Sequence, residues 1–235
     1  MNDSETEEIP EDYEVEEFER PSVAVDDIIF TVKDDDLKVA LVKRNEKPFE
    51  GKWALPGSFV GMEESLEEAA ERTLKEKTGV ERKVYMEQLY TFGKPERDPR
   101  TRVITVGYFA LVNEEDIGLQ ETGNVKDIRW HSVYSLPELG FDHDEIIQYA
   151  VKRLRWKIEY STAVFSLLPE QFTLTQLQDT YEIILDAELD KRNFRKKIKK
   201  QGLVEETGKR QKNVSHRPAK LYKAGKDTGE IVEVL

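Results

Sequence analysis

The stretch Pro56–Val80 reads PGSFVGMEESLEEAAERTLKEKTGV and predicts a loop, a helix and a second loop. The helix is expected over about Ser65–Lys77, because the following glycine ends it. Thr73, Glu76 and Lys77 are spaced i, i+3 and i+4, so they project from one face of this helix. That face combines one hydroxyl, one carboxylate and one ammonium group.

The same stretch resembles the Nudix box, a loop–helix–loop motif written G-x5-E-x7-R-E-U-x-E-E-x-G-U, in which U is aliphatic. In Nudix hydrolases, the three acidic positions of the R-E-U-x-E-E segment bind the divalent metals that activate water. Aligned without a gap, the motif positions are Ser58 in place of the first Gly, then Glu64, Arg72, Thr73, Leu74, Glu76, Lys77, Gly79 and Val80. Of the three metal positions, only Glu76 is acidic.

This departure bears directly on the chemistry. Mg²⁺ prefers several oxygen ligands, mostly carboxylates and waters, and the hydroxyl of Thr73 is a poor substitute. Lys77 adds a positive charge that would repel a divalent ion. At roughly 4 Å and an effective dielectric of 20, each pair of unit charges interacts by about 4 kcal/mol. Glu68 and Glu71 lie on the opposite face of the helix. We therefore expect a vestigial box, no enzyme activity, and no requirement for a metal or cofactor, with residual hydrolase activity left open.

Length and composition favour a soluble protein of one large or two modest domains. The chain has 235 residues, of which 38% are hydrophobic and 9% aromatic. It shows no apolar run near 18 residues in length and no apolar N-terminal stretch, so neither a membrane span nor a signal peptide is expected. The absence of cysteine excludes disulfides, thiolate catalysis and zinc fingers. A cytoplasmic location is expected.

The net charge of −12 conceals a strong segregation of charge along the chain. Residues 1–19 hold ten Asp or Glu and no Lys or Arg, which predicts a disordered acidic tail. Residues 191–226 hold fourteen Lys or Arg against two acids, a local net charge of +12. A basic segment in an acidic chain suggests a nucleic-acid partner.

Residues 20–160 predict an α/β/α sandwich with a mixed sheet. Hydrophobic alternation marks strands at 22–32, 37–43, 83–92, 103–112 and 126–131. A second helix is expected over Asp144–Ile158, in addition to the helix of the box.

Residues 161–226 predict a winged helix-turn-helix, followed by a C-terminal tail over 227–235. After a connector at Leu167–Phe172, Thr173 and Gln176 form a capping-box pattern that starts a helix to about Leu185. Asp190 caps a second helix that ends at Gly202. On that helix Phe194, Ile198 and Gln201 share one face, whereas Arg192, Arg195, Lys196 and Lys199 are expected on the exposed face. Strands at 203–207 and 219–223 are expected to pair around a basic loop, Lys209–Pro218.

A broken Nudix box followed by a winged helix resembles the NrtR-type Nudix-related transcription regulators, including their sugar-responsive AraR-type relatives, over about 20–224. One departure is His216, where many relatives have Gly before the Arg-Pro of the wing. Further matching pieces are Arg97-Asp98-Pro99, Phe141-Asp142-His143, Phe172-Thr173-Leu174, Asn193-Phe194-Arg195-Lys196 and Arg217-Pro218-Ala219-Lys220-Leu221-Tyr222.

The resemblance implies that the Nudix domain senses an effector, an ADP-ribose-like nucleotide or a sugar, without hydrolysing it. The effector residues are expected to be Arg44, Arg97, Asp98 and His143, since arginine binds phosphate through its bidentate fork. The two arginines are alternatively structural ion-pair partners, and His143 a structural histidine. Phe49, Trp53 and Trp130 could stack on a base, although core packing is the better interpretation of each.

A single winged helix contacts only a few base pairs, so a homodimer on a palindromic double-stranded DNA operator is expected. The DNA-binding residues are expected to be Arg192, Asn193, Arg195, Lys196, Lys199, Lys209, Arg210, Arg217 and Lys220. Within this set, Arg195 is expected to read a guanine and Lys199 to neutralise a phosphate. Two alternatives remain open: an active Nudix hydrolase of nucleoside diphosphate derivatives, using Glu64 and Glu76 with an acid from a distant loop, and a dual or RNA-binding Nudix relative.

Overall fold

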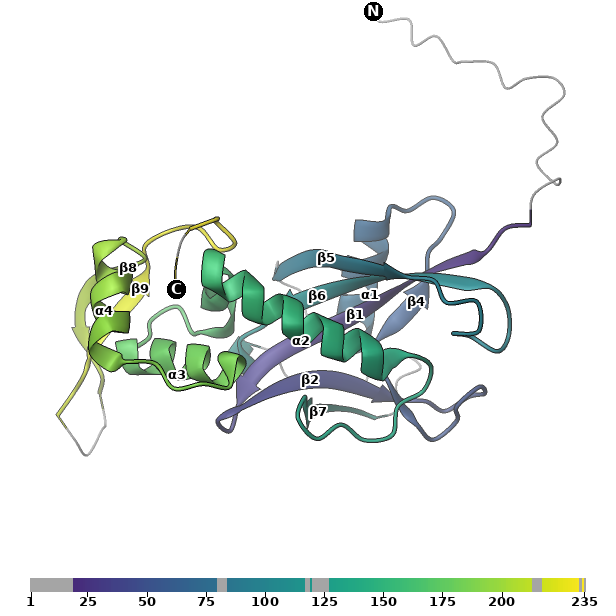
Figure 1. The fold of residues 1–235 in the computed structure, drawn as a ribbon, viewed down its shortest axis with the longest axis horizontal. Coiled ribbons are helices and arrows are strands. Elements are labelled where there is room, and N and C mark those ends of the chain that lie inside the picture. Colours follow the sequence, from purple (N-terminus) through teal and green to yellow (C-terminus); the bar gives the residue numbers. More distant parts are fainter. Residues whose placement is uncertain are drawn as a thin grey trace, which may run out of the picture.

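The computed structural model describes residues 19–79, 84–116, 119, 127–212, 217–232 and 234. Figure 1 shows two parts along the long axis, a twisted sheet flanked by helices and a smaller part of helices with a β-hairpin. The α/β/α sandwich followed by a winged helix is confirmed. Of the acidic segment 1–19, all but the last residue lies outside the described residues. No helix in the described ranges is long and apolar enough to cross a membrane.

The sheet is built around its first strand, which has neighbours of opposite direction. β1 pairs antiparallel with β2 and parallel with β6, from Ser22 opposite Val103 to Phe30 opposite Leu111. The order is β3-β2-β1-β6-β5, with β4 paired to β1 and β7 to β2. The strands are β1 (Ser22–Lys33), β2 (Asp36–Lys43), β3 (Trp53–Ala54), β4 (Gly57–Phe59), β5 (Tyr85–Phe92), β6 (Val103–Leu111) and β7 (Ile128–Ser132). The sequence does not predict β3 and β4, because 2 and 3 residues are too few to show a period.

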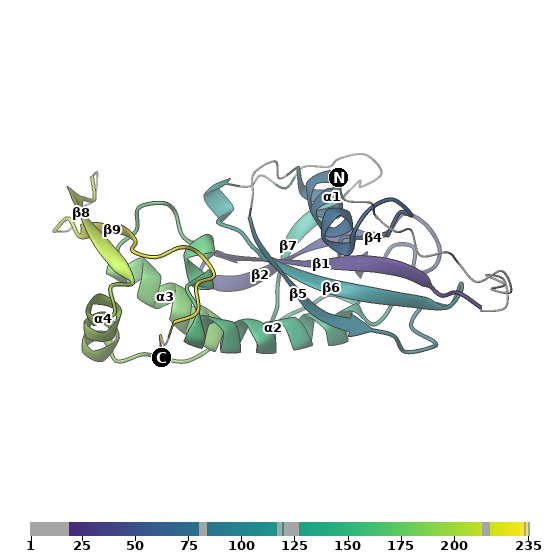
Figure 2. The ribbon, with the colours of Figure 1, turned by 90° about the horizontal axis from the view of Figure 1, so that it is seen from above.

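Helix α1 (Leu66–Thr78) covers one face of the sheet (Figure 2). Ser65 and Glu68 form a reciprocal capping box, with the Glu68 carboxylate accepting from the Ser65 amide at 2.8 Å. Gly79 ends the helix in the left-handed conformation, with φ of 70°. The fully buried Ala69 lets the helix approach the sheet closely. The predicted box helix is confirmed to within one residue at each end.

Helix α2 (His143–Tyr160) crosses the opposite face (Figure 2) and extends beyond the expected 144–158 at both ends. Its apolar side chains fill the main core against the even-numbered residues of β1, such as Ile28 and Phe30. The same core continues without a break into the C-terminal part, where Leu177 and Tyr181 belong to it. The two parts are therefore packed together and not merely tethered.

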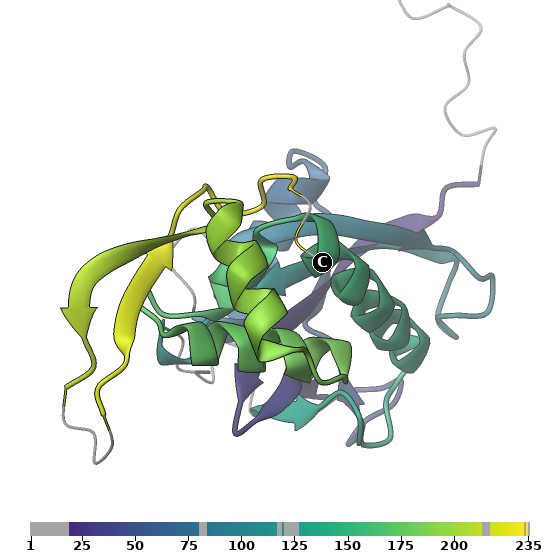
Figure 3. The ribbon, with the colours of Figure 1, turned by 60° about the vertical axis from the view of Figure 1, so that its left-hand side comes forward.

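The C-terminal part has the helices and hairpin of a winged helix (Figure 3). Thr173 and Gln176 form the expected capping box, and the Asp190 side chain accepts from the Asn193 amide at 2.7 Å. The connector is joined to the wing, because Phe172 and Tyr222 exchange two backbone hydrogen bonds. Its elements are the 3-10 helix η3 (Ala163–Leu167), α3 (Leu174–Leu185), α4 (Lys191–Lys200), β8 (Val204–Arg210) and β9 (Lys220–Ala224).

The segment predicted as a separate C-terminal tail packs back onto the end of α2. The amides of Val232 and Val234 donate to the carbonyls of Tyr160 and Glu159 at 2.8 and 2.9 Å. Val234 is 1% exposed and belongs to the main core. Gly229 has φ of 85°, and a Cβ there would lie 2.7 Å from a Tyr85 ring carbon on β5. The described part of the tail therefore straps α2 to the sheet.

Candidate functional site

The first metal position of the box has become a buried joint between α1 and β4. Thr73 is 0% exposed, and its hydroxyl donates to the Ala69 carbonyl at 2.8 Å. The Ser58 hydroxyl lies 2.5 Å from the Thr73 hydroxyl. Because the single proton of Thr73 is already used, Ser58 is the donor in this pair. Thr73 therefore stabilises the packing of the helix and presents no oxygen to solvent.

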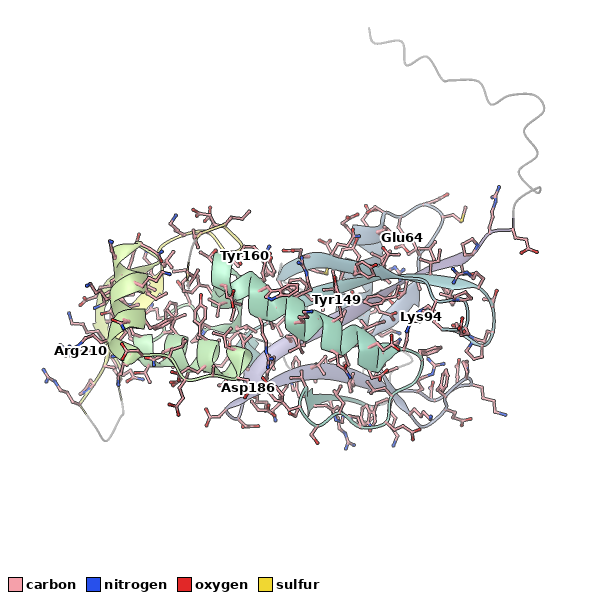
Figure 4. All side chains as sticks on the ribbon, viewed as in Figure 1. Glu64, Lys94, Tyr149, Tyr160, Asp186 and Arg210 are labelled. Carbon is pink, nitrogen blue, oxygen red and sulfur yellow. The ribbon has the colours of Figure 1, made fainter. Side chains whose placement is uncertain are left out.

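The acids that the box retains are held by one arginine. Arg72 donates to both Glu64 oxygens at 2.6 and 2.9 Å, and its guanidinium lies 3.6 Å from Glu76. The Gly61 amide donates to Glu64 at 2.6 Å. These hydrogen bonds, first from Arg72 and then from Gly61, lower the pKa of Glu64 to about 2. Glu64 is thus an ionised anchor of the loop before α1 (Figure 4).

The donor set at the box does not fit a divalent metal. Thr73 is a buried donor, Glu76 faces Arg72, and Lys77 brings a cation toward the neighbouring pocket. Within the described ranges, no group of three or more His, Asp or Glu could hold a metal ion.

A pocket of about 300 Å³ lies beside the box and gathers all four predicted effector residues. Arg44 follows β2, Arg97 and Asp98 lie between β5 and β6, and His143 begins α2. Lys77 enters the pocket from α1. The sequence therefore predicted the location of the pocket, although the four side chains differ in their contacts.

Arg97 is engaged in buried ion pairs. It donates to the two Asp142 oxygens at 2.8 and 3.0 Å and to Asp26 at 3.3 Å. Its side chain is 4% exposed. Removing one partner of such a buried pair strongly destabilises a fold. These contacts favour the structural interpretation of Arg97, whose role toward an effector stays a prediction.

Asp98 orients another arginine, Arg100, which the sequence did not single out. Arg100 donates to the two Asp98 oxygens at 2.7 and 3.0 Å, and its amide donates to the same carboxylate. The side-chain hydrogen bonds from Arg100 lower the pKa of Asp98. The Arg100 side chain is 46% exposed and lines the pocket. The only sequence signal was a third charged residue just after the matching Arg97-Asp98-Pro99 piece.

His143 acts within the fold as a neutral acceptor. Its Nδ1 accepts from the Leu55 amide at 2.8 Å, which leaves the proton of the neutral ring on Nε2, 3.6 Å from Asp26. Burial lowers the pKa of His143. The structural interpretation of this histidine is favoured.

Aromatic side chains at the mouth of the pocket differ from those considered from the sequence. Phe141 lines the pocket, and the Arg44 guanidinium lies 4.9 Å from its ring centre. Arg44 Nε also donates to the Pro48 carbonyl at 2.7 Å. Trp53 packs edge-on against His131 at 4.4 Å between ring centres. Trp130 packs against a small core cluster, and Phe49 contacts Phe141 at 4.8 Å.

The predicted DNA-binding residues lie on α4 and on the hairpin of β8 and β9 with its connecting loop. Arg192, Asn193, Lys196 and Lys199 are exposed, as expected. The expectation that Arg195 lies on the exposed face is wrong, because this side chain is half-buried and donates to the Thr175 hydroxyl of α3 at 2.8 Å. On the hairpin, the four predicted cations are also exposed: Lys209, Arg210, Arg217 and Lys220. His216 lies outside the described residues.

Comparison with known proteins identifies both parts. A model of the NUDIX domain matches residues 20–150, and a model of the NrtR DNA-binding winged helix domain matches residues 164–224. The chain is 39% identical over 215 residues to the ADPR responsive transcriptional repressor NtrR of Acinetobacter baylyi, which covers 90% of this chain and 85% of that protein.

Two solved structures extend the likeness to three dimensions. Shewanella oneidensis NrtR complexed with a 27mer DNA is 38% identical, with a TM-score of 0.76, over 86% of this chain and 93% of that chain. The NUDIX domain of the same protein complexed with ADP ribose is 40% identical, with a TM-score of 0.54, over 61% of this chain and 94% of that chain. The chain therefore belongs to the NrtR family, in which a Nudix domain is followed by a DNA-binding winged helix.

Proposed function

We propose that this protein is a transcriptional regulator that binds duplex DNA through α4 and the wing and binds ADP-ribose in the pocket beside α1 without hydrolysing it. One observation carries the separation of binding from catalysis. The helix face that would hold the metal has been converted into a buried joint at Thr73 and a cation at Lys77, while the adjoining pocket is retained. Shape and hydrogen bonds suffice to hold a ligand, whereas attack on a pyrophosphate needs metal-activated water.

The chemistry of the pocket suits a nucleoside diphosphate sugar. Arg44, Lys77 and Arg100 line it as cations, and Phe141 offers an aromatic surface for a base. Its volume of about 300 Å³ is at the small end of ligand pockets. Two relatives support the same ligand, since the Acinetobacter repressor is named ADPR responsive and the Shewanella NUDIX domain is solved with ADP ribose.

Helix α2 is positioned to connect the pocket with the DNA-binding part. At the pocket end, Asp142 holds Arg97. Three turns later, Arg155 Nε donates to the Ile184 carbonyl of α3 at 2.8 Å. The Tyr134 hydroxyl, which accepts from Arg155 at 3.3 Å, donates to the Ile183 carbonyl at 3.0 Å. The pocket is therefore attached to the start of α2, and α3 to the C-terminal half of the same helix.

A dimer on a two-fold symmetric operator is part of the proposal. A single winged helix contacts few base pairs, and specific affinities usually need more surface than one module provides. Two-fold symmetry presents two recognition helices to a palindrome. By analogy with the Acinetobacter relative, which is named an ADPR responsive transcriptional repressor, the bound protein represses and its DNA binding responds to ADP-ribose. Sedimentation should show a dimer at micromolar concentration, and a monomer that binds one per operator would contradict this assembly.

The experiment that tests binding without catalysis uses one protein sample and two readouts. Calorimetry with ADP-ribose should show saturable binding, and incubation of the same mixture with Mg²⁺ or Mn²⁺ should release no AMP. Turnover near 1 s⁻¹ or above, at the low end of ordinary enzymes, would support the hydrolase alternative. That alternative is favoured by the retained Glu64 and Glu76, but Arg72 contacts both carboxylates.

A further inference from the structure

A second concavity, with a volume of about 340 Å³, lies between the N-terminus of α3, the middle of α4 and the wing. Its lining includes five cations and no described acid. The cationic lining residues are Arg195, Lys199, Arg210, Arg217 and Lys220. We call this concavity the basic notch. It is built from three elements far apart in sequence, so its cations are placed by the fold and not by local composition.

The guanidinium of Arg195 is held at the wall of the basic notch. Its Nη2 donates to the Thr175 hydroxyl at 2.8 Å. Its Nε is buried and has no hydrogen-bond partner among the described residues. A buried donor without a partner is unfavourable, so the protein alone leaves this guanidinium incompletely hydrogen-bonded. Arg195 is thus directed into the notch and away from the outer face of α4.

The other cations leave a strongly positive interior. The Lys199 ammonium lies 5.4 Å from the ring centre of Tyr222, which also lines the notch. Lys220 pairs with Glu206 at 2.6 Å, so its charge is partly neutralised. Arg210 donates to the Pro218 carbonyl at 3.0 Å, which fixes it at the base of the wing. The notch therefore suits a compact anion with several acceptor oxygens.

We propose that the basic notch binds one phosphodiester of the DNA backbone, and that Arg195 and Lys199 set the register of the protein on the duplex. Base reading then falls to Arg192 and Asn193, which are exposed on the N-terminal half of α4. Arginine matches guanine and asparagine matches adenine in the major groove. This inference rests on the proposed function and replaces the expectation that Arg195 reads a guanine.

Two arginines on the same helix provide the matched test. The probes are a duplex selected by the wild-type protein from a random-sequence pool and an unrelated duplex of equal length. Arg195→Ala should weaken binding to both probes by the same factor, roughly 10- to 100-fold. It should also flatten the slope of log affinity against log salt by about one unit. Arg192→Ala should weaken only the selected duplex and relax its sequence preference.

Two further measurements separate a phosphate role from a loss of folding. Arg195→Lys keeps the charge and should recover part of the affinity for both probes, while thermal melting checks each variant. Neutral methylphosphonate linkages, introduced one at a time, should reveal a position that weakens the wild type but not Arg195→Ala.

The phosphate role of the basic notch would be overturned if Arg195→Ala changed only the sequence preference. It would also be overturned if no methylphosphonate position weakened the wild type while leaving Arg195→Ala unaffected. Either result would leave the proposed DNA binding intact. Failure of the wild type to select any duplex would overturn the proposed function as well.

Discussion

At the scale of single residues, the box shows how a catalytic motif can be kept for its packing. Thr73 stands where an acid would face a metal, yet it is fully buried and joins Ser58 to the helix backbone. The sequence predicted the loss of the metal site from residue type and helical spacing. It did not predict the joint, because the partner lies 15 residues earlier on a strand too short to show a pattern.

Thr73→Val should therefore destabilise the fold without changing ligand affinity. Valine keeps the shape but removes the hydrogen bonds of the Thr73 hydroxyl to Ala69 and Ser58. At roughly 0.5–1.5 kcal/mol for each bond, this should lower the free energy of unfolding by about 1–3 kcal/mol. Urea unfolding measures the change, and ADP-ribose calorimetry provides the control. Ser58→Ala should cost less stability in the Thr73→Val variant than in the wild type, and strictly additive losses would contradict the joint.

Glu64 gives a prediction about pH. Its folded-state pKa of about 2 lies below the ordinary 4.5, so the ion pair with Arg72 stabilises the fold above pH 4.5 and is lost as the pH falls toward 2. The Glu64→Gln variant should lose less stability than the wild type across that interval. Urea unfolding at a series of pH values tests this, and parallel curves would show that the pair contributes nothing.

At the scale of elements, sequence periodicity located the long helices and strands but not the contacts between them. The capping-box pattern at Thr173 carries its own signal and predicted the start of α3, whereas the capping box at Ser65 was recognised only in the structure. The prediction of an exposed side chain on α4 was correct for Arg192 and Lys196 and wrong for Arg195. The spacing of residues within one helix carries no information about Thr175, the partner of Arg195 on α3. Arg100 was missed because loop residues have no period.

Helix α2 provides the prediction at this scale. Arg155→Ala removes the contacts to the end of α3, so it should reduce the effect of ADP-ribose on DNA affinity at least several-fold, within the usual coupling of about 1–3 kcal/mol. Affinity for each ligand alone should change little. Lys152→Ala, exposed on the same helix, is the matched control. Unchanged coupling in the Arg155 variant would exclude this route.

At the scale of the whole molecule, the two parts share one hydrophobic core and carry their chemistry at opposite ends. Glu64 of the box and Arg210 of the wing mark the separation in Figure 4. The composition anticipated this division through its basic C-terminal segment, but not the C-terminal strap, whose buried Val234 completes the core. A ligand can change DNA binding only by favouring one arrangement of these parts over another.

The most direct test of a ligand-responsive, non-hydrolysing regulator is a titration of a labelled duplex, selected by the protein itself, with and without ADP-ribose. Saturating ADP-ribose should shift the DNA affinity by about 5- to 150-fold, and DNA should shift the ADP-ribose affinity by the same factor. The nucleotide should be recovered intact. Coincident titration curves, or conversion of ADP-ribose to AMP during the experiment, would contradict this function.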